Sequence, residues 1–325
     1  MTAPLVTRVH KANAAAIGAA VRCLAASGLV GFPTETVYGL GADATNGQAV
    51  ARLYQAKGRP AFNPLISHVV DLAAAQKLAH FNADATRLAR TFWPGPLTLV
   101  LAKAENCPVA ELATAGLDSV AVRVPHHPVA QEILAGLGKP VVAPSANRSG
   151  HVSPTSAAHV LADLDGRIDL IVDGGETPVG VESTVIACLG ETALLRPGGV
   201  PREAIERTLG RPLATLTRRQ EAPLAPGMLS SHYAPRTPLR LNIETVAAGE
   251  ALLAFGPRAA PGAERALRVL NLSPRGDLVE AAANLFSHLR ALDAAGANVI
   301  AVMTIPHHGL GEAINDRLAR AAAPR

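Results

Sequence analysis

Short apolar runs alternate with alanine-rich stretches of helical periodicity through the first 210 residues of the chain. The runs have the length of strands, and they predict strands at 29–32, 65–70, 97–102, 119–124, 140–143 and 168–172. The stretches between them predict helices at 14–26, 47–57, 71–80, 83–92, 127–136, 155–163 and 201–209. Residues 183–188 and 192–196 are predicted to pair as a hairpin. This alternation predicts an α/β sheet packed with helices.

The pattern is interrupted at residues 211–238, which are rich in proline and polar residues and are typical of a linker. It then resumes, with strand-like runs at 239–243, 251–255 and 298–303 and helices at 277–292 and 310–322. We therefore predict a large domain at 1–210, a linker at 211–238 and a small C-terminal α/β domain at 239–325. A merely flexible linker has little use for His232, Tyr233 and Arg236 between prolines, so we expect this linker to be docked.

Composition adds bounds to this picture. The 325 residues are 49% hydrophobic, which is enough for a sizeable core. The net charge of +4 fits a phosphate-bearing ligand but is weak support for one. The longest basic run is Arg218–Arg219 and aromatic residues are only 3%, which argues against a protein that wraps or stacks on nucleic acid.

The chain shows no pattern of a secretory signal or a membrane span, and we expect it to be cytoplasmic. Cys23, Cys107 and Cys188 stand far apart without a CxxC pair, so free thiols in a reducing compartment are expected. Zinc-type ligand spacing is absent from the sequence, and the adjacent histidine pairs 126–127 and 307–308 are poorly arranged for a shared metal.

Hydroxyl groups cluster where the first strand of the large domain ends. Thr34, Thr36 and Tyr38 lie in the segment 31–46, at a strand end of the kind where α/β sheets bind ligands. A tight turn capped by hydroxyl groups is the structural alternative for the same residues.

Two cations follow at the end of the predicted helix 47–57. Lys57 and Arg59 flank Gly58, which lets the backbone approach an anion closely, and both side chains suit phosphate. Alternatively, they only satisfy the helix dipole. Asn63 precedes a proline and fits a turn, and His68 in an apolar strand is typical of a core histidine by spacing alone.

Arg123 interrupts the apolar strand 119–124, where a charge must meet either a structural carboxylate or an anionic ligand. The loop at 143–156 carries Ser145, Asn147, Ser149 and Ser153 as donors and leads to a helix, an arrangement that favours anions. It contains neither a Walker A nor a GxSxG motif.

Carboxylates and hydroxyls recur in the segment 173–187. Asp173 and Glu182 fit either caps or metal-binding carboxylates. Ser183 and Thr184 open the next predicted strand, and Arg196 closes the one after it.

Taken together and in order, these segments resemble the YrdC-type family of threonylcarbamoyl-AMP synthases. The resemblance rests on PTETVYGLG at 33–41, KGRP at 57–60, NPL at 63–65 with His68, WPGPLT at 93–98, VAVRVP at 120–125, APSAN at 143–147 with SG at 149–150, GVESTV at 180–185 and LRPG at 195–198. It covers nearly all of residues 10–210. The segment HYAPRTPL at 232–239 and the tail resemble the longer, two-domain, Sua-type members.

The resemblance implies a large twisted-sheet YrdC-like domain with a positively charged cavity and a second, smaller Rossmann-like α/β domain. It implies that L-threonine, bicarbonate and ATP give threonylcarbamoyl-AMP and pyrophosphate, with Mg2+ accompanying ATP and no protein metal site. The adduct would serve a downstream tRNA threonylcarbamoyltransferase machinery, and stable direct binding of tRNA is left open. By resemblance, the residues around threonine are Thr36, His68, Arg123, Ala143 and Ser183. Those around ATP are Lys57, Arg59, Asn63, Ser119, Ser145, Asn147, Ser153, Arg196, His232 and Tyr233, with Lys57 and Arg59 assigned to catalysis.

There are two alternatives, one of a different class and one a related enzyme. One is a basic RNA-binding module without catalysis, which would release no pyrophosphate from ATP in the presence of threonine and bicarbonate. The other is a related carbamoyltransferase of hydrogenase maturation, whose acylphosphatase-like and zinc-finger-like segments are not visible in this sequence.

Overall fold

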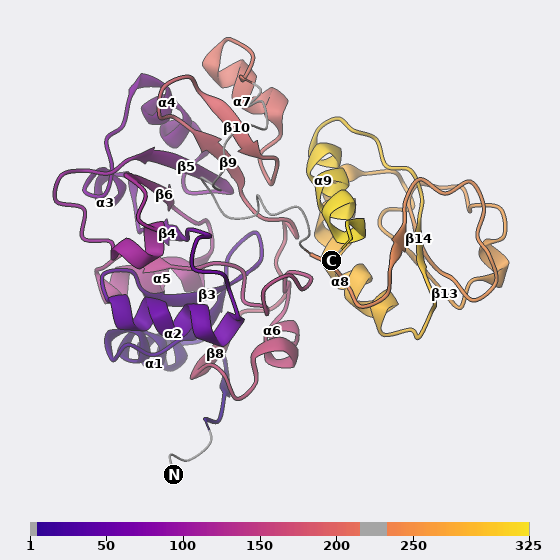
Figure 1. Cartoon of the computed structure of the whole chain (residues 1–325), viewed down its shortest axis with the longest axis horizontal. Coiled ribbons are helices and arrows are strands. Elements are labelled where there is room, and N and C mark those ends of the chain that lie inside the picture. Colours follow the sequence, from indigo (N-terminus) through magenta and orange to yellow (C-terminus); the bar gives the residue numbers. More distant parts are fainter. Residues whose placement is uncertain (1–4, 215–232, 325) are drawn as a thin grey trace.

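The computed structural model describes residues 5–214 and 233–324, which form two α/β units side by side (Figure 1). Within these residues the first unit holds a ten-stranded mixed sheet of order β1-β8-β2-β3-β7-β4-β6-β5-β9-β10. Its strands are β1 (Arg8–Lys11), β2 (Val30–Pro33), β3 (Tyr38–Asp43), β4 (Ile66–His68), β5 (Leu97–Ala102), β6 (Ser119–Arg123), β7 (Val141–Val142), β8 (Leu170–Asp173), β9 (Thr184–Ala187) and β10 (Ala193–Arg196).

Helices cover this sheet and bury its apolar faces. They are α1 (Ala14–Ala25), α2 (Gly47–Lys57), α3 (Leu72–Gln76), α4 (Ala83–Phe92), α5 (Pro128–Leu137), α6 (Ala157–Leu164) and α7 (Arg202–Leu209). Asparagine side chains begin three of them: Asn13 accepts from the Ala16 N–H at 2.9 Å, Asn46 caps α2, and Asn82 caps α4. Gly58 ends α2 in the left-handed region, at φ +60°, so the chain turns sharply toward Arg59.

The second unit is a four-stranded sheet of order β11-β14-β12-β13 in the described residues, and all its pairings are parallel. It consists of β11 (Leu239–Arg240), β12 (Ala251–Ala254), β13 (Arg268–Asn271), β14 (Ile300–Val302), α8 (Leu278–Asp293) and α9 (Leu310–Ala322). Figure 1 shows α8 and α9 on the side of this unit that faces the first unit.

One apolar cluster continues across the boundary between the units. Phe286 and Ile314 of the second unit belong to the same buried cluster as Val37, Val152 and Val181 of the first. The backbones also approach closely, because a Cβ atom added at Gly180 would lie 2.3 Å from the Ala282 carbonyl oxygen of α8. The two units are therefore packed tightly against each other.

Most predicted elements are present, and α2, α4, β5 and α9 have the predicted bounds. The predicted hairpin is confirmed, since β9 and β10 are antiparallel neighbours. The predicted helix at 71–80 is wrong in extent, because α3 ends at Gln76. The apolar strand run at 140–143 likewise shortens to the two residues of β7.

The sequence pattern missed β1, β3 and β13. β1 is exposed at all four positions and has no apolar periodicity. Gly39 and Gly41 in β3 are typical of a turn, yet residues 38–41 pair with β2 and residues 42–43 pair with β7. Glycine is required there because a Cβ atom at Gly41 would lie 2.6 Å from the Phe32 ring.

No helix in the described parts of the chain has the length and apolar character needed to cross a membrane.

Candidate active site

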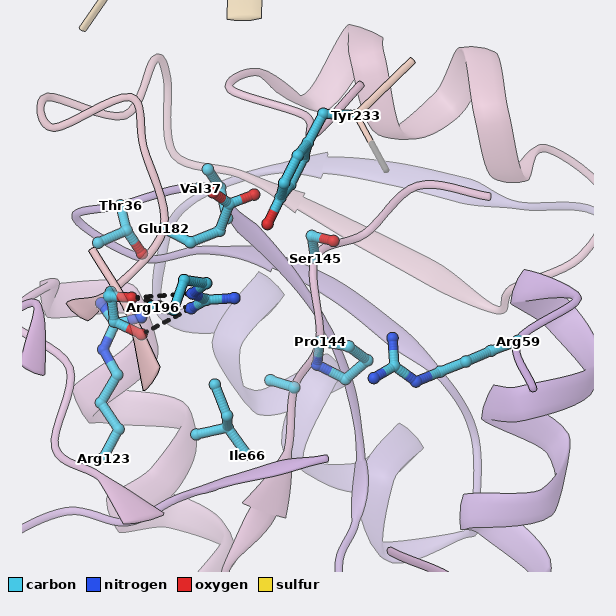
Figure 2. A pocket seen from close by; sticks show the side chains of 12 residues that line it. Thr36, Val37, Arg59, Ile66, Arg123, Pro144, Ser145, Glu182, Arg196 and Tyr233 are labelled. Atoms are coloured by element: carbon cyan, nitrogen blue, oxygen red, sulfur yellow. Dashed lines mark hydrogen bonds between the residues drawn. The ribbon is translucent and has the colours of Figure 1, made fainter. Parts of the chain in front are cut away.

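A pocket opens where several strand ends of the first unit meet Tyr233, near the C-terminal end of the predicted linker (Figure 2). Its lining residues are Thr36, Val37, Arg59, Ile66, Arg123, Ala143, Pro144, Ser145, Glu182, Ser183, Arg196 and Tyr233. They come from the β2–β3 turn, the turn after α2, the strands β4 and β6, the loop after β7, the residues just before β9, the end of β10 and the predicted linker. Eight of the predicted ligand-binding residues are among them: Thr36, Arg59, Arg123, Ala143, Ser145, Ser183, Arg196 and Tyr233.

Arg123 meets a structural carboxylate, one of the two partners that the sequence allowed, and its contact with an anionic ligand stays a prediction. Its Nη2 lies 2.7 Å from Glu35 Oε1, and the side chains of both residues are less than a tenth exposed. The contact is an ion pair without hydrogen-bond geometry, while Glu35 Oε2 accepts from the His126 N–H at 3.0 Å. The pairing with Glu35 thus holds the guanidinium in place at the pocket wall.

Arg196 is also buried, and it binds the start of β9. Its Nη2 donates to the Ser183 carbonyl oxygen at 2.8 Å, and the Ser183 hydroxyl lies 2.7 Å from that of Thr98. Burial lowers the pKa of Arg196 below its ordinary value, but the group stays a cation at neutral pH. Ser183 and Arg196 therefore form one rigid corner of the pocket.

Arg59 enters the pocket from the opposite side, as Figure 2 shows. Its Nη2 donates to the Pro64 carbonyl oxygen at 2.9 Å and its Nε to that of Asn63 at 3.2 Å. Burial lowers the pKa of Arg59 to about 10, so it too remains charged at neutral pH. The side-chain amide of Asn63 is buried and has no hydrogen-bond partner among the described residues, as expected of a group that a ligand or water satisfies.

Lys57 does not line the pocket. Its side chain is buried, and Nζ donates to the carbonyl oxygens of Ser145 and Asn147, both at 2.5 Å. Burial lowers the pKa of Lys57 well below its ordinary value. The lysine therefore fastens the loop after β7 from behind, and direct contact of its ammonium with ATP stays a prediction.

His68 lies on β4, paired in register with Arg123 of β6. It is 2% exposed, and its Nδ1 is 3.2 Å from the Ile66 carbonyl oxygen. Burial, with the charge of Arg123, lowers its pKa to about 3, so the ring is neutral at physiological pH. It lies next to the pocket wall without lining the pocket, and its role toward threonine stays a prediction.

Three further predicted residues do not line the pocket. Ser119 begins β6, at the end of the strand opposite Arg123. The Asn147 amide donates to the His151 carbonyl oxygen at 2.7 Å and braces its own loop. The Ser153 hydroxyl donates to Glu182 Oε1 at 2.5 Å. Their ATP contacts stay predictions, and His232 lies outside the described residues.

Glu182 belongs to an ion pair, a role that differs from both the cap and the metal ligand that the sequence suggested. Its Oε2 accepts from Nε of Arg317, on α9, at 2.8 Å. Burial alone would raise the pKa of Glu182, but Arg317 and Arg196 outweigh burial and hold it below its ordinary value. Asp173 lies elsewhere, with Lys11 2.5 Å away. The described residues contain no group of three or more histidine, cysteine or acidic side chains placed to hold a metal ion.

Tyr233 forms the upper wall of the pocket, and its hydroxyl points inward in Figure 2. Its ring stacks on Phe286 of α8 at a centroid distance of 5.6 Å, and the guanidinium of Arg317 lies 5.2 Å from its centroid. The side chain is 1% exposed. This end of the predicted linker is therefore packed between the pocket and the second unit.

Sequence reasoning missed Glu35 and Arg317. Glu35 lies inside the quoted PTETVYGLG segment, so its position was available although its partner was not. Arg317 falls on the apolar face of α9 among Ile314, Leu318 and Ala321, and a lone arginine at such a position is the available signal of a buried partner.

The arrangement suits a ligand with both carboxylate and phosphate groups. Arg59, Arg123 and Arg196 present guanidinium groups, and Thr36, Ser145 and Ser183 present hydroxyls. Such a wall positions anions and stabilises charge that develops during group transfer.

Comparisons with known proteins cover both units. The sequence model of a family described as "Telomere recombination" matches residues 22–198, and one described as "Threonylcarbamoyl-AMP synthase, C-terminal domain" matches residues 200–323. The chain is 41% identical to the threonylcarbamoyl-AMP synthase of Bacillus subtilis, over 98% of this chain and 96% of that protein. It is 44% identical to that of Pyrococcus abyssi, over 91% of each.

A solved structure resembles the whole molecule. The crystal structure of Pyrococcus abyssi Sua5 complexed with L-threonine matches with a TM-score of 0.87 and 38% identity, over 98% of this chain and 97% of that one. The predicted α/β fold class, a large twisted sheet with a second α/β unit, is confirmed.

Proposed function

This chain belongs to the threonylcarbamoyl-AMP synthase family, and from that premise we propose that it joins L-threonine, bicarbonate and ATP into threonylcarbamoyl-AMP and pyrophosphate. The observation that carries the proposal is the buried pocket with three guanidinium groups, in a chain that aligns over 98% of its length with a protein crystallised with L-threonine. The product would serve the threonylcarbamoyl modification of the adenosine next to the tRNA anticodon.

The chemistry divides into two steps. The threonine amine attacks the carbon of bicarbonate, water leaves, and a carbamate forms. A carbamate oxygen then attacks the α-phosphorus of ATP, the bond from that phosphorus to the β-phosphate oxygen breaks, and pyrophosphate leaves. Neither step requires a covalent bond to the protein, so positioning and charge stabilisation can lower the barrier.

We assign threonine to the side of the pocket formed by Thr36, Arg123 and Ser183. The guanidinium of Arg123 suits the amino-acid carboxylate, and its pairing with Glu35 fixes its position. Neutral His68 lies behind this wall and adds no second positive charge. The methyl side chain of Ala143 leaves room for a small substrate.

We assign the phosphates of ATP to Ser145 and to Arg59 and Arg196, which reach into the pocket from opposite sides. A fixed cation about 4 Å from a phosphate charge contributes roughly 4 kcal/mol at an effective dielectric constant near 20. Lys57 supports Ser145 from behind, because it holds the carbonyl groups of the loop that carries this serine.

We propose that Mg2+ enters with ATP. Glu182 in the pocket lining and Glu35 behind Arg123 are both already paired with arginines, so the described residues fit a metal carried by phosphates and water better than one held in a protein cage. Bound Mg2+ would neutralise phosphate charge and orient the pyrophosphate leaving group.

The proposal includes a cytoplasmic location and transfer of the adduct to a downstream tRNA threonylcarbamoyltransferase machinery. Bicarbonate is the smallest of the three substrates, and we propose that it enters beside the threonine amine. Stable binding of tRNA to this chain is not part of the proposal.

The test is pyrophosphate release by the purified full-length chain. Release should require ATP, threonine and bicarbonate together, and mass spectrometry should detect threonylcarbamoyl-AMP. Omission of threonine alone or bicarbonate alone provides the controls. Binding of RNA without any threonine-dependent pyrophosphate release would favour the RNA-binding alternative.

A further inference from the structure

Arg317 is a fully buried arginine that reaches from the second unit to the pocket of the first. It lies on α9 and is 0% exposed. Its Nε donates to Glu182 Oε2 at 2.8 Å, and its Nη1 donates to the Pro197 carbonyl oxygen at 2.9 Å and to Asp316 Oδ2 at 2.7 Å. A guanidinium removed from water in this way must have a specific partner, and Glu182 is the one that lines the pocket.

Glu182 places a negatively charged side chain in the lining of a pocket proposed to bind anions. Its carboxylate lies in the pocket that the proposed function gives to the triphosphate, and its Oε1 accepts from the Ser153 hydroxyl. An uncompensated carboxylate there would repel the phosphates of ATP, because charges interact strongly where water is excluded. Arg196 also acts on this carboxylate, but it is assigned to the phosphates, so the pocket needs a second cation behind Glu182.

We propose that Arg317 is a positioning residue for the nucleotide: the second unit supplies it to neutralise Glu182, so that the pocket admits ATP. The inference rests on the proposed function. The guanidinium of Arg317 also lies 5.2 Å from the ring centroid of Tyr233, so one side chain supports two parts of the pocket wall. By this reasoning the second unit acts electrostatically on the site as well as packing against it.

A different ion pair between the units provides the matched control. Arg202 of α7 pairs with Glu312 of α9, and their side chains are 33% and 28% exposed. Neither residue lines the pocket. Arg202→Gln removes an arginine contact to the same helix without touching Glu182, so it reports on docking of the units alone.

The experiment compares wild type with Arg317→Gln, Arg317→Lys, the double variant Glu182→Gln/Arg317→Gln, and Arg202→Gln. Wild type must first show pyrophosphate release that depends on threonine and bicarbonate; if it does not, the proposed function fails before this inference is tested. KM for ATP, KM for threonine and kcat are then measured separately, and thermal melting monitors folding.

We expect Arg317→Gln to raise KM for ATP by at least about tenfold, equivalent to about 1.4 kcal/mol. KM for threonine should change less, because threonine is a zwitterion without net charge. Arg317→Lys retains the positive charge, so its KM for ATP should lie within about threefold of the wild-type value. In the double variant KM for ATP should return most of the way to the wild-type value, because the carboxylate left unpaired by Arg317→Gln is also removed. Arg202→Gln should leave KM for ATP unchanged.

Three results would overturn the inference: an unchanged KM for ATP in folded Arg317→Gln, a double variant as impaired as Arg317→Gln, or an equal defect in Arg202→Gln. If Arg317→Gln does not fold, Arg317→Lys and the double variant carry the test. A KM for ATP that is clearly higher in the folded double variant than in Arg317→Lys would then count against charge neutralisation.

Discussion

At the scale of single residues, the cations of the KGRP segment have different tasks although they are two positions apart. Arg59 lines the pocket, whereas Lys57 is buried against the carbonyl groups of Ser145 and Asn147. The left-handed Gly58 between them separates the two directions. Substitutions at the two positions should therefore fail in different ways.

Arg59→Ala should lower kcat/KM for ATP by at least about tenfold, because it removes a cation from the proposed phosphate side at a cost near 1.4 kcal/mol or more. Lys57→Ala should lower activity and also destabilise the fold by about 1–3 kcal/mol, because it leaves two carbonyl groups without their donor. Steady-state kinetics and urea unfolding of both variants separate the effects. Equal stability losses, or unchanged turnover in both, would contradict this division of tasks.

The sequence predicted the residue types of the pocket better than their partners. Thr36, Arg123 and Ser183 were expected at the ligand and do line the pocket. The charge balance was not predictable, because Glu35 and Arg317 meet their partners only after distant segments fold together. The sequence shows which charged residues belong to the site, but it does not show which of them pair with each other in the folded protein.

At the scale of elements, the loop before β9 is shaped by its contact with α8. Gly180 has φ +75°, and a Cβ atom there would lie 2.3 Å from the Ala282 carbonyl oxygen and 2.5 Å from Ala283 Cα. Gly175 also has positive φ, at +88°, but no atom lies within 4 Å of its added Cβ. Comparison of the two glycines therefore distinguishes the cost of backbone strain, which both share, from the cost of steric contact, which only Gly180 has.

Gly175→Ala should cost about 1–2 kcal/mol of folding free energy through the backbone alone. Gly180→Ala should cost about 1–3 kcal/mol beyond that, because backbone atoms of α8 must move. It should also lower kcat/KM for ATP, since Glu182 lies two residues further along the chain. Urea unfolding and kinetics check both variants, and indistinguishable stabilities would show that the loop does not depend on its contact with α8.

The elements themselves were largely predictable, because long helices carry clear periodicity and buried strands carry continuous apolar runs. β3 was not, since the glycines that allow Phe32 and Ala143 to pack against it also remove the apolar pattern. β1 was not, since an exposed edge strand has no buried face to record in the sequence.

At the scale of the whole molecule, the second unit completes the surroundings of the pocket. Residues 211–325 contain Tyr233, Phe286 and Arg317, and Arg290 of α8 donates to the Val152 carbonyl oxygen and to Asp163 Oδ2. The boundaries at 210 and 238 stay predictions, but the contacts between the described parts are extensive.

Deletion of residues 211–325 should lower kcat/KM for ATP by more than Arg317→Gln does, because it removes Tyr233 as well as the cation behind Glu182. It should also expose Val37, Val152 and Val181, and aggregation of the truncated chain should increase. Kinetics and size-exclusion chromatography measure the two effects. Full activity in the truncated chain would reduce the second unit to an appendage.

Tyr233 and Val37 line the pocket and also belong to the apolar cluster between the units. Ligand binding and attachment of the second unit are therefore two equilibria that share side chains, and such equilibria influence each other equally in both directions. If attachment of the second unit stabilises bound ATP by a given free energy, bound ATP stabilises the attachment by the same amount. By this coupling, a substrate bound in the pocket also strengthens the association of the two units, and the association is weaker when the pocket is empty.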